Sequence, residues 1–522
     1  MKHPPGLAYW LRVVGLPLLL VLLTSLLLGA HYETNDDFSI TLLLRGRTAA
    51  APVTDLHLYF HGWAWLLARL YQLAPTVPWY GLTLYALLAL ALVLLTAMLE
   101  RLLAPHTRPW PRAGLLAAFL LLAGLEHAQW FNYVRVPLLL SGAAVLWAAQ
   151  LHGRRWVLLL ALLLFGAAWG IRPSAALLGA AAVAPAAWWL GGRPAGRVVL
   201  SVAAVALLLG GLLQLTRPPE AARYRRLDVR KSEVLDYGWR VPAPRTRADS
   251  LGVQAVEHWA FGDTTLVNEA FFQRAYRPQP QPAAFLAHKA GLTVLAVVRD
   301  YFPLLIINGL LLWLGLRLPA APRRRQWLYL LAFGGLLLAL GAVLKLPPRL
   351  AGPLLTLLTV AHLGLLPRRP WPWPRGLRRY VASGLLGGLL LLYGAKVVHR
   401  AAVLQREESR NGEALLRLAA AASGQGSGAP AAAPGPLVGS RVEGLFKSLS
   451  PFRQYLPAGG PPWLLLTGWP TLDPSQPRLR QQLSGVRVQA EALRRLRRRP
   501  AVRWVGEDSV TEPRLPEAAQ QE

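Results

Sequence analysis

Apolar runs of membrane-spanning length recur between residues 11 and 397, and they constrain the fold of this chain more than any other feature. Leu16–Ala30, Leu82–Leu99 and Val198–Leu215 are clear examples. A helix needs about 20 residues to cross the hydrocarbon core of a bilayer, and backbone polar groups inside lipid must be paired within the segment. The runs therefore predict transmembrane helices. The composition agrees, because only 16% of the 522 residues are charged, whereas a soluble domain carries about 25%.

The formal net charge of +30 raises the question of nucleic-acid binding. The basic residues are nearly all arginine and form short blocks between the apolar runs, whereas a nucleic-acid-binding domain gathers them on one soluble face. We therefore expect membrane lipids, and no nucleic acid, around this chain. The absence of cysteine excludes disulfides and thiolate metal sites.

The arginine blocks indicate how the chain crosses the membrane. Cytoplasmic loops are enriched in Lys and Arg, so we expect the blocks to share the inner side. The blocks are Arg101/Arg108/Arg112, Arg154/Arg155, Arg193/Arg197, Arg317/Arg323/Arg324/Arg325 and Arg368/Arg369/Arg375/Arg378/Arg379. The spans that satisfy this rule are 11–30, 80–99, 113–125, 132–150, 156–171, 174–191, 198–215, 302–318, 327–345, 350–366 and 380–397. The sequence thus predicts a polytopic, mainly α-helical bundle of about 11 spans, with the N-terminus inside and the C-terminus outside.

The same rule requires Asp55–Leu73 to lie along the outer surface, because another span there would place the later arginine blocks outside. His57, His61, Arg69 and Gln72 fall near one helical face of this segment, and the other face is apolar. That pattern is typical of a helix in the interface plane. The alternative is a span whose polar face packs against other helices.

The chain divides into a transmembrane domain at 1–398 with outer loops at 31–79 and 216–299, a helix and linker at 399–440, and an extracytoplasmic domain at 441–522. We expect the second outer loop to form a small helical cap. Gly, Ala, Pro and Ser dominate 423–440, which is typical of a flexible linker. After the linker the pattern predicts a small α+β module. Its predicted elements are strands at Trp463–Thr467 and Val502–Val505, a turn at Thr471–Ser475 and a helix at Val488–Arg498.

The first outer loop concentrates the residues that could carry chemistry. Directly after the first apolar run comes Tyr32-Glu33-Thr34-Asn35-Asp36-Asp37-Phe38. Three carboxylates beside a membrane surface repel one another, so one interpretation is a solvated loop, which Asn and Asp favour. The other interpretation is a general base, alone or beside a metal-binding carboxylate, at the height of a lipid headgroup.

The order of motifs here resembles a known group of proteins. Asn35-Asp36-Asp37 is followed by Gly46, by the stretch Leu70-Tyr71-Gln72-Leu73-Ala74-Pro75, and by Pro78-Trp79-Tyr80 at the start of the next span. This order is similar to that of multi-pass bacterial envelope proteins with the layout of GT-C glycosyltransferases. The resemblance is strongest over residues 31–100, and over the rest of the chain it rests on the arrangement of spans.

The resemblance implies sugar transfer from a polyprenyl-phosphate donor to a glycan, lipid or protein acceptor of the envelope. The active site would face outward from the bacterial inner (cytoplasmic) membrane. The first-loop carboxylate would be the base. We assign that role to Asp36, with Asp37 orienting it or binding a divalent cation such as Mg or Mn.

The leaving lipid phosphate requires positive groups near the outer leaflet. Arg172, Lys345 and Arg349 fall at predicted outer helix ends, and Arg135 lies about a turn inside a predicted span. Ionisable residues inside spans usually face a cavity or a partner. The alternative for the first three is that they extend to the interface without a specific ligand.

Three further interpretations stay open. His57 and His61, four residues apart, are candidate metal ligands, although no third ligand is apparent. A transporter or flippase of lipid-linked saccharides would have related halves with broken helices, and we find no internal repeat. A non-catalytic membrane scaffold would use its outer tail to bind a partner and would not need Asp36 or Asp37.

Overall fold

The computed structural model describes residues 6–151, 154–316, 318–366, 377–423 and 435–506. It is mainly helical, with 73% helix and 4% strand. The chain forms two compact units, each assembled from distant segments. The first, here called the membrane unit, comprises Met1–Ala30, Thr83–Leu215 and Ala283–Leu404. The second, here called the loop unit, comprises His31–Leu82, Thr216–Pro282 and Gln405–Glu522.

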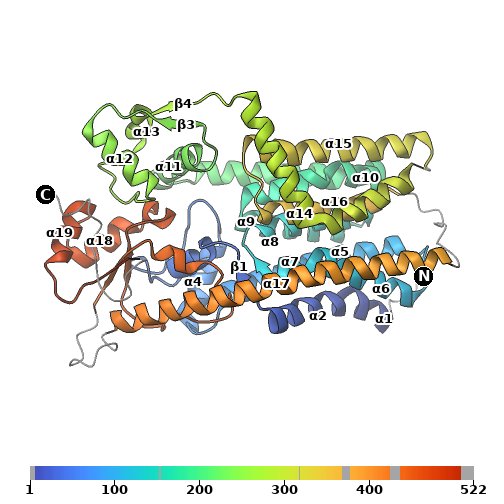
Figure 1. Ribbon diagram of the computed structural model, residues 1–522, viewed down its shortest axis with the longest axis horizontal. Coiled ribbons are helices and arrows are strands. Elements are labelled where there is room, and N and C mark those ends of the chain that lie inside the picture. The colour runs from blue at the N-terminus through green and yellow to red at the C-terminus, as the bar shows by residue number, and fades with distance from the viewer. Residues whose placement is uncertain (1–5, 152–153, 317, 367–376, 424–434, 507–522) are drawn as a thin grey trace. The chain divides into compact units, whose positions relative to one another are not determined.

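Long helices that run alongside one another form the membrane unit (Figure 1). Its elements are α1 (Leu7–Trp10), η1 (Leu11–Gly15), α2 (Leu16–Leu23), η2 (Thr24–Leu28), most of α5 (Trp79–Leu103), α6 (Pro109–Phe119), η3 (Leu120–Gly124), α7 (Leu125–Gln129), β2 (Trp130–Phe131), α8 (Arg135–Gln150), α9 (Arg155–Ile171), α10 (Pro173–Leu215), α14 (Ala283–Gly315), α15 (Ala320–Val343), α16 (Pro348–Leu365) and the first part of α17 (Leu377–Ala422).

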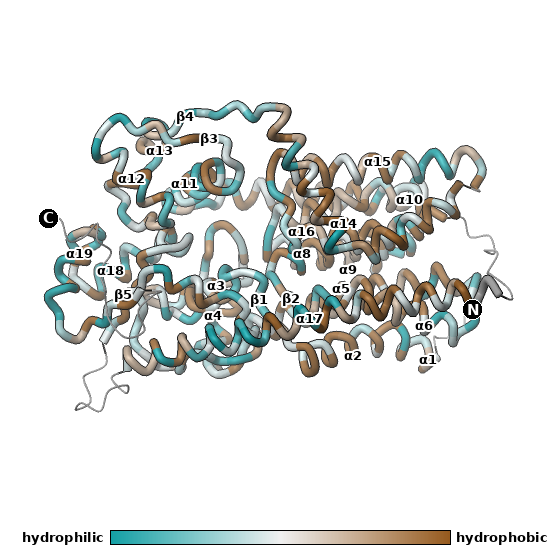
Figure 2. The backbone as a smooth tube through the Cα atoms, in the orientation of Figure 1, coloured by the Kyte–Doolittle hydropathy of each residue, from teal (hydrophilic) through white to brown (hydrophobic). Residues whose placement is uncertain are grey.

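Several of these helices are apolar on all sides, as helices in lipid are. Among the described residues, six helices are long and apolar enough to cross a membrane, and apolar residues dominate the helices of this unit (Figure 2). Leu27, Leu163 and Leu391 are 70%, 70% and 78% exposed. Leucines exposed to this extent along many helices would form large apolar patches, which soluble monomers rarely carry. The chain therefore has the character of a membrane protein.

Each predicted span falls mostly within helical structure, but only six helices of the described residues are long and apolar enough to cross a membrane, and several bounds differ from the prediction. The predicted spans 174–191 and 198–215 are the two halves of α10, which is interrupted at Gly192 (φ 61°). The second outer loop, predicted to reach residue 299, ends earlier, because α14 already begins at Ala283. The charged pair Arg299–Asp300 favours a loop up to that point. The backbone instead stays helical and bends at Tyr301, ahead of Pro303.

Close backbone packing fixes the interior of the membrane unit. Residues Arg135–Ala149 of α8 are all buried. At Gly179 of α10, the β-carbon of any other residue would come within 2.1 Å of the Leu138 carbonyl oxygen of α8. Only glycine permits this approach. Gly142 of α8 is restricted in the same way, because a β-carbon there would clash with the side chain of Leu357 in α16. Small residues thus let α8, α10 and α16 pack closely.

The loop unit is smaller in its elements and more polar. It contains β1 (His31–Tyr32), α3 (Asp36–Leu44), α4 (Trp63–Leu73), α11 (Pro219–Leu235), β3 (Arg240–Pro242), α12 (Arg247–Glu257), α13 (Glu269–Ala275), β4 (Tyr276–Pro278), β5 (Leu437–Ser440), η4 (Val442–Phe446), β6 (Trp463–Leu465), η5 (Trp469–Leu472), α18 (Gln476–Ser484), α19 (Gln489–Arg497) and β7 (Arg503–Gly506).

The second outer loop forms the small helical structure that the sequence predicts. Helices α11, α12 and α13 share an apolar core that includes Phe261, Phe271 and Phe272. Strands β3 and β4 of the same segment pair antiparallel, with Val241 opposite Arg277.

The C-terminal module is α+β, with a parallel sheet in the order β6-β5-β7. The predicted strands at Trp463 and Val502 and the predicted helix at Val488 are present as β6, β7 and α19. The linker prediction extends too far, because its last residues, 437–440, form the central strand β5. Residues 424–434 of the predicted linker lie outside the described residues, as do Arg317, Arg368, Arg369 and Arg375 of the basic blocks.

The predicted surface helix is shorter than Asp55–Leu73. Helix α4 begins only at Trp63, because His57, Phe60 and Gly62 have left-handed backbone angles (φ 62°, 58° and 77°) that no α-helix accommodates. One face of α4 is buried. The other face combines Arg69 and Gln72 with exposed apolar residues, including Leu73 at 82% exposure. The location of α4 in the membrane interface stays a prediction.

Candidate functional site

The acidic pair of the first outer loop lies in the first turn of α3. Asp37 is fully buried, and its Oδ1 accepts a hydrogen bond from the Tyr80 hydroxyl at 2.8 Å. Asp36 is half-buried, and its Oδ2 accepts from the Thr34 hydroxyl at 3.3 Å. Carboxylates are favoured in the first turn of a helix, because the backbone N–H groups there carry partial positive charge. The interpretation as a solvated loop is therefore wrong for Asp37.

The sequence of α3 explains why this pair is held so firmly. After Asp37, every residue from Phe38 to Leu44 is buried. Phe38 packs against Phe446, with ring centroids 5.1 Å apart. The fully buried Phe60 lies against Tyr80, with ring centroids 5.5 Å apart. The helix and the partner of Asp37 are thus both fixed by apolar packing.

A second polar cluster of the loop unit has no counterpart among the predicted sites. The His31 Nδ1 lies 3.2 Å from Glu408 Oε2, and Glu408 Oε1 accepts from the Tyr455 hydroxyl at 2.7 Å. Arg453 pairs with the same carboxylate at 3.1 Å. These residues are far apart in the sequence, so no spacing pattern could reveal them. They tie the second half of α17 to the segments at 31 and 450–455.

His57 and His61 do not form the helical pair that their spacing suggests, because both precede α4. His57 Nδ1 lies 3.0 Å from Asp55 Oδ2, and its backbone N–H donates to Asp55 Oδ1 at 2.8 Å. Among the described residues, no three His, Asp or Glu side chains are grouped to hold a metal ion. In the part of the chain that the structure describes, Asp37, His57 and His61 are therefore not grouped as ligands of one cation.

Three carboxylates surround His57. Burial lowers the pKa of its ring, but the hydrogen bond to Asp55 and the charges of Asp55, Asp473 and Glu220 outweigh this and raise the pKa above its ordinary value. The hydrogen bond to His57 in turn lowers the pKa of Asp55. Burial raises the pKa of Asp473.

These shifts predict a pH-dependent contribution of His57 to stability. A raised pKa in the folded state stabilises the fold below the unfolded pKa of about 6.5, and the gain disappears as pH rises through the folded pKa. We expect His57→Gln to destabilise the protein by about 0.5–1 kcal/mol at pH values below 6, since exposed partners screen the pair, and by less at pH 9. Thermal unfolding of the wild type and the variant, below pH 6 and at pH 9, measures this difference in stability. Asp55→Asn should remove the same pH dependence, and an equal effect of His57→Gln at both values would contradict it.

The membrane unit contains a buried ionic network around Glu126. Its Oε1 lies 3.4 Å from Arg135 Nη1 and accepts from the Tyr301 hydroxyl at 3.0 Å. Its Oε2 lies 2.9 Å from Arg400 Nη1. Both guanidinium groups also lie over the ring of Trp130, at 5.8 Å and 4.7 Å. One carboxylate thus joins two arginines from α8 and α17.

The protonation of the neighbouring His127 follows from its partners. Arg135 Nη1 lies 3.1 Å from His127 Nδ1, and a guanidinium can only donate, so Nδ1 is an acceptor. The proton is then on Nε2, which lies 3.0 Å from the Thr356 hydroxyl oxygen. His127 is therefore neutral.

Arg135 is thus the first residue of α8, fully buried in a network, and does not lie a turn inside a span as predicted. The sequence does carry a signal for its partners that the predicted site omits. Glu126 and His127 come directly after an apolar run that ends at Leu125, and ionisable residues at such positions are functional candidates.

The other three predicted phosphate ligands lie at helix ends or in a link between helices of the membrane unit. Arg172 ends α9, donates to the Tyr133 hydroxyl and lies 5.3 Å from the Tyr133 ring centroid. Lys345 is exposed in the link between α15 and α16, and Arg349 is half-buried in the first turn of α16. Arg172 thus contacts Tyr133, which shortly precedes Arg135, the first residue of α8.

Comparisons with known proteins add no relative: no family model, curated protein or solved structure matches this chain.

Proposed function

We propose that this protein is a membrane glycosyltransferase of the GT-C type, which transfers a sugar from a polyprenyl-phosphate donor to an acceptor of the cell envelope. The observation that carries the proposal is the first turn of α3. There a half-buried Asp36 stands beside a buried Asp37 that Tyr80 holds in place. A general base needs a fixed position and access to its substrate, and Asp36 combines the two.

The proposed mechanism follows from where charge develops. Asp36 takes the proton of the acceptor hydroxyl as that oxygen attacks the anomeric carbon of the donor sugar. The bond between the anomeric carbon and the phosphate oxygen breaks, and the polyprenyl phosphate leaves with the electron pair. The leaving phosphate requires positive groups to stabilise its negative charge, and Arg172, Lys345 and Arg349 are the residues that the sequence predicts for this role. Arg135, which the sequence also predicts as a phosphate ligand, is fully buried and paired with Glu126, so in this proposal it has a positioning role.

Asp37 orients Asp36 in this proposal. A divalent cation, Mg or Mn, would supply further stabilisation of the leaving phosphate if Asp37 bound it. The hydrogen bond from Tyr80 favours the orienting role, because it already uses one oxygen of the Asp37 carboxylate.

The proposal includes the predicted topology of about 11 spans, with the N-terminus inside and the active site on the outer side of the bacterial inner membrane. Its experiment follows label from a polyprenyl-phosphate sugar pool into envelope glycan, in cells with and without the protein. We expect label transfer only in cells that contain it. Reporter fusions after Arg112, Arg155, Arg325 and Arg379 should report cytoplasm, and fusions after Pro218 and Ser440 should report the outside.

Two outcomes would favour the alternatives. A cytoplasmic signal at Ser440 would contradict an outward-facing site. Label that crosses the membrane on its lipid without reaching an acceptor would indicate a flippase, and normal labelling in cells without the protein would leave the scaffold function.

A further inference from the structure

Two arginines directly after α3 carry positive charge into the interior of the loop unit. Arg45 caps the C-terminal end of α3, and Arg47 follows after Gly46. Gly46 has φ 68°, and a β-carbon there would lie 2.8 Å from the backbone nitrogen of Pro52. Only glycine allows this turn, which directs both arginines into the unit. Arg45 is half-buried and Arg47 is 5% exposed.

Neither arginine has an acidic partner among the residues that the structure describes. Arg45 Nη2 donates to the Pro75 carbonyl at 2.9 Å, and its guanidinium lies 5.4 Å from the Tyr71 ring centroid. Arg47 Nη1 donates to the Gly460 carbonyl, and its buried Nε makes no hydrogen bond. Buried charges are normally paired, as Arg135 is with Glu126. Arg45 and Arg47 depart from that rule.

The electrostatics agree with this geometry. Burial lowers the pKa of Arg45. Burial lowers the pKa of Arg47 to about 10, and the positive charge of Arg45 contributes to that shift. The positive charges of Arg45 and Arg47 therefore repel each other, and no carboxylate of the described residues offsets them.

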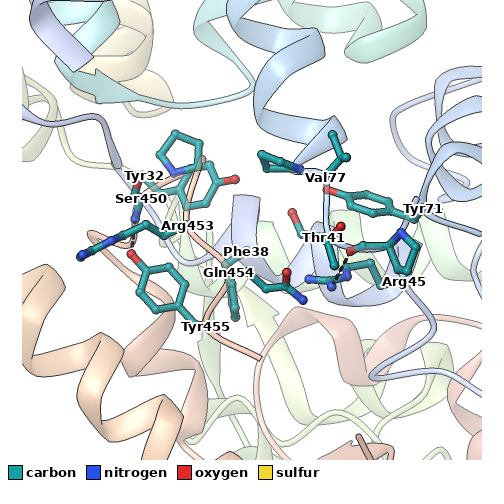
Figure 3. A pocket seen from close by; sticks show the side chains of 14 residues that line it. Tyr32, Phe38, Thr41, Arg45, Tyr71, Val77, Ser450, Arg453, Gln454 and Tyr455 are labelled. Carbon is teal, nitrogen blue, oxygen red and sulfur yellow. Dashed lines mark hydrogen bonds between the residues drawn. The ribbon is translucent and has the colours of Figure 1, made fainter. Parts of the chain in front are cut away.

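The side chain of Arg45 lines a pocket of the loop unit (Figure 3). Phe38 and Thr41 of α3 and Tyr71 of α4 form one part of the wall, and the loop at 450–455 forms another. That loop contributes Arg453, whose side chain is 70% exposed although it pairs with Glu408. Tyr455 is also in the wall and accepts a hydrogen bond from the Ser450 backbone N–H at 2.9 Å. The pocket is small and positively charged, and it suits the end of a ligand better than a whole sugar ring.

We propose that this pocket binds a carboxylate or phosphate substituent of the acceptor, and that the acceptor is therefore an acidic glycan. A guanidinium binds two oxygens of such a group with parallel hydrogen bonds. The inference rests on the proposed function, because α3 carries Asp36 at one end and Arg45 at the other. Its nine residues span about 13 Å, so an oligosaccharide anchored at Arg45 could present a hydroxyl of a neighbouring sugar at Asp36.

The test measures binding to the full-length protein in detergent, without donor or transfer. The probes are glucuronic acid and glucose 6-phosphate, with glucose as the neutral comparison. We expect saturable binding of both acids and none of glucose. Arg45→Gln should weaken the binding of both acids at least tenfold. Arg69→Gln is the matched control, because Arg69 is an exposed arginine of α4 that bonds to Gln72 outside the pocket, and it should bind like the wild type.

Arg45→Lys keeps the charge but loses the paired geometry, so it should show an intermediate affinity and guards against a folding defect in Arg45→Gln. Equal affinities in the wild type and Arg45→Gln, or the absence of saturable binding of either acid, would overturn the inference. Binding that persists in a protein without transferase activity would refute the proposed function alone. Transfer to neutral glycans without acid binding would refute only the acidic acceptor. A loss of binding when phosphatidylglycerol replaces phosphatidylcholine in nanodiscs would instead identify a lipid headgroup as the occupant, and would also overturn the inference.

Discussion

Replacing Glu126 with glutamine is expected to destabilise the membrane unit by about 3–5 kcal/mol, the usual cost of breaking a buried ion pair from one side. The carboxylate of Glu126 contacts Arg135 and Arg400 and accepts from Tyr301. Glutamine keeps the shape and can still accept one hydrogen bond, but it cannot offset the charge of either arginine. Arg135 is fully buried, so water does not replace the lost interaction. Unfolding in mixed detergent measures the change.

Two further variants separate the ion pair from a general effect of removing a negative charge. Glu413→Gln removes an exposed carboxylate on α17 and should change stability by less than about 0.5 kcal/mol. In a double-mutant cycle, Glu126→Gln combined with Arg400→Gln should cost clearly less than the sum of the single variants, because the two share one interaction. Additive effects, or a wild-type stability of Glu126→Gln, would show that the network does not hold the helices together.

The helices of the membrane unit could be predicted from the sequence because one strong physical constraint acts on each of them. A segment in lipid must satisfy its own backbone, so an apolar run of sufficient length is helical whatever its neighbours are. The predicted ends are less accurate where local chemistry conflicts with this rule. At Asp300, a charged residue suggests a loop, but the helix continues through it and bends at Tyr301.

The loop unit is harder to predict, because tertiary contacts decide its local structure. His57 and Phe60 adopt left-handed backbone angles that their residue types do not favour. The buried Phe60 against Tyr80 and the bond from His57 to Asp55 hold this segment, and neither contact follows from the spacing. The strand β5 likewise reads as part of a linker, because its Gly-Ser ending resembles the residues before it. Its two neighbouring strands come from later in the chain.

The candidate site shows the same division. The sequence indicates Asp36, Asp37 and Arg135 as residues that need an explanation, and the structure gives Asp37 and Arg135 buried partners. It cannot indicate which partners, since Tyr80, Glu126 and Arg400 are assigned only by the fold. It also gives no reason to single out Arg45 and Arg47, because only the folded chain shows that Arg45 is half-buried, that Arg47 is buried, and that neither has an ion pair with a carboxylate of the described residues.

Asp36→Asn is expected to abolish sugar transfer while the protein still folds and enters the membrane. Loss of general-base action typically lowers a rate by about 10²–10⁴-fold. Asparagine keeps the size of Asp36 and can still accept from the Thr34 hydroxyl. Asp36 is half-buried at the start of α3, so the exchange should disturb the packing little. Label transfer into envelope glycan, normalised to the amount of protein in the membrane, measures the effect.

Asp37 provides the matched comparison, because it is the neighbouring carboxylate with a different environment. It is fully buried and accepts from Tyr80, so Asp37→Asn should lower thermal stability as well as transfer, and Tyr80→Phe should reproduce part of that loss. If Asp37 bound a divalent cation, a chelator would inhibit the wild type and added Mg or Mn would restore it. If Asp37 only orients Asp36, the chelator has no effect. If Asp36→Asn cells label their envelope as the wild type does, Asp36 is not the base, because asparagine cannot take a proton from the acceptor hydroxyl. The transporter or scaffold function would then replace the glycosyltransferase proposal.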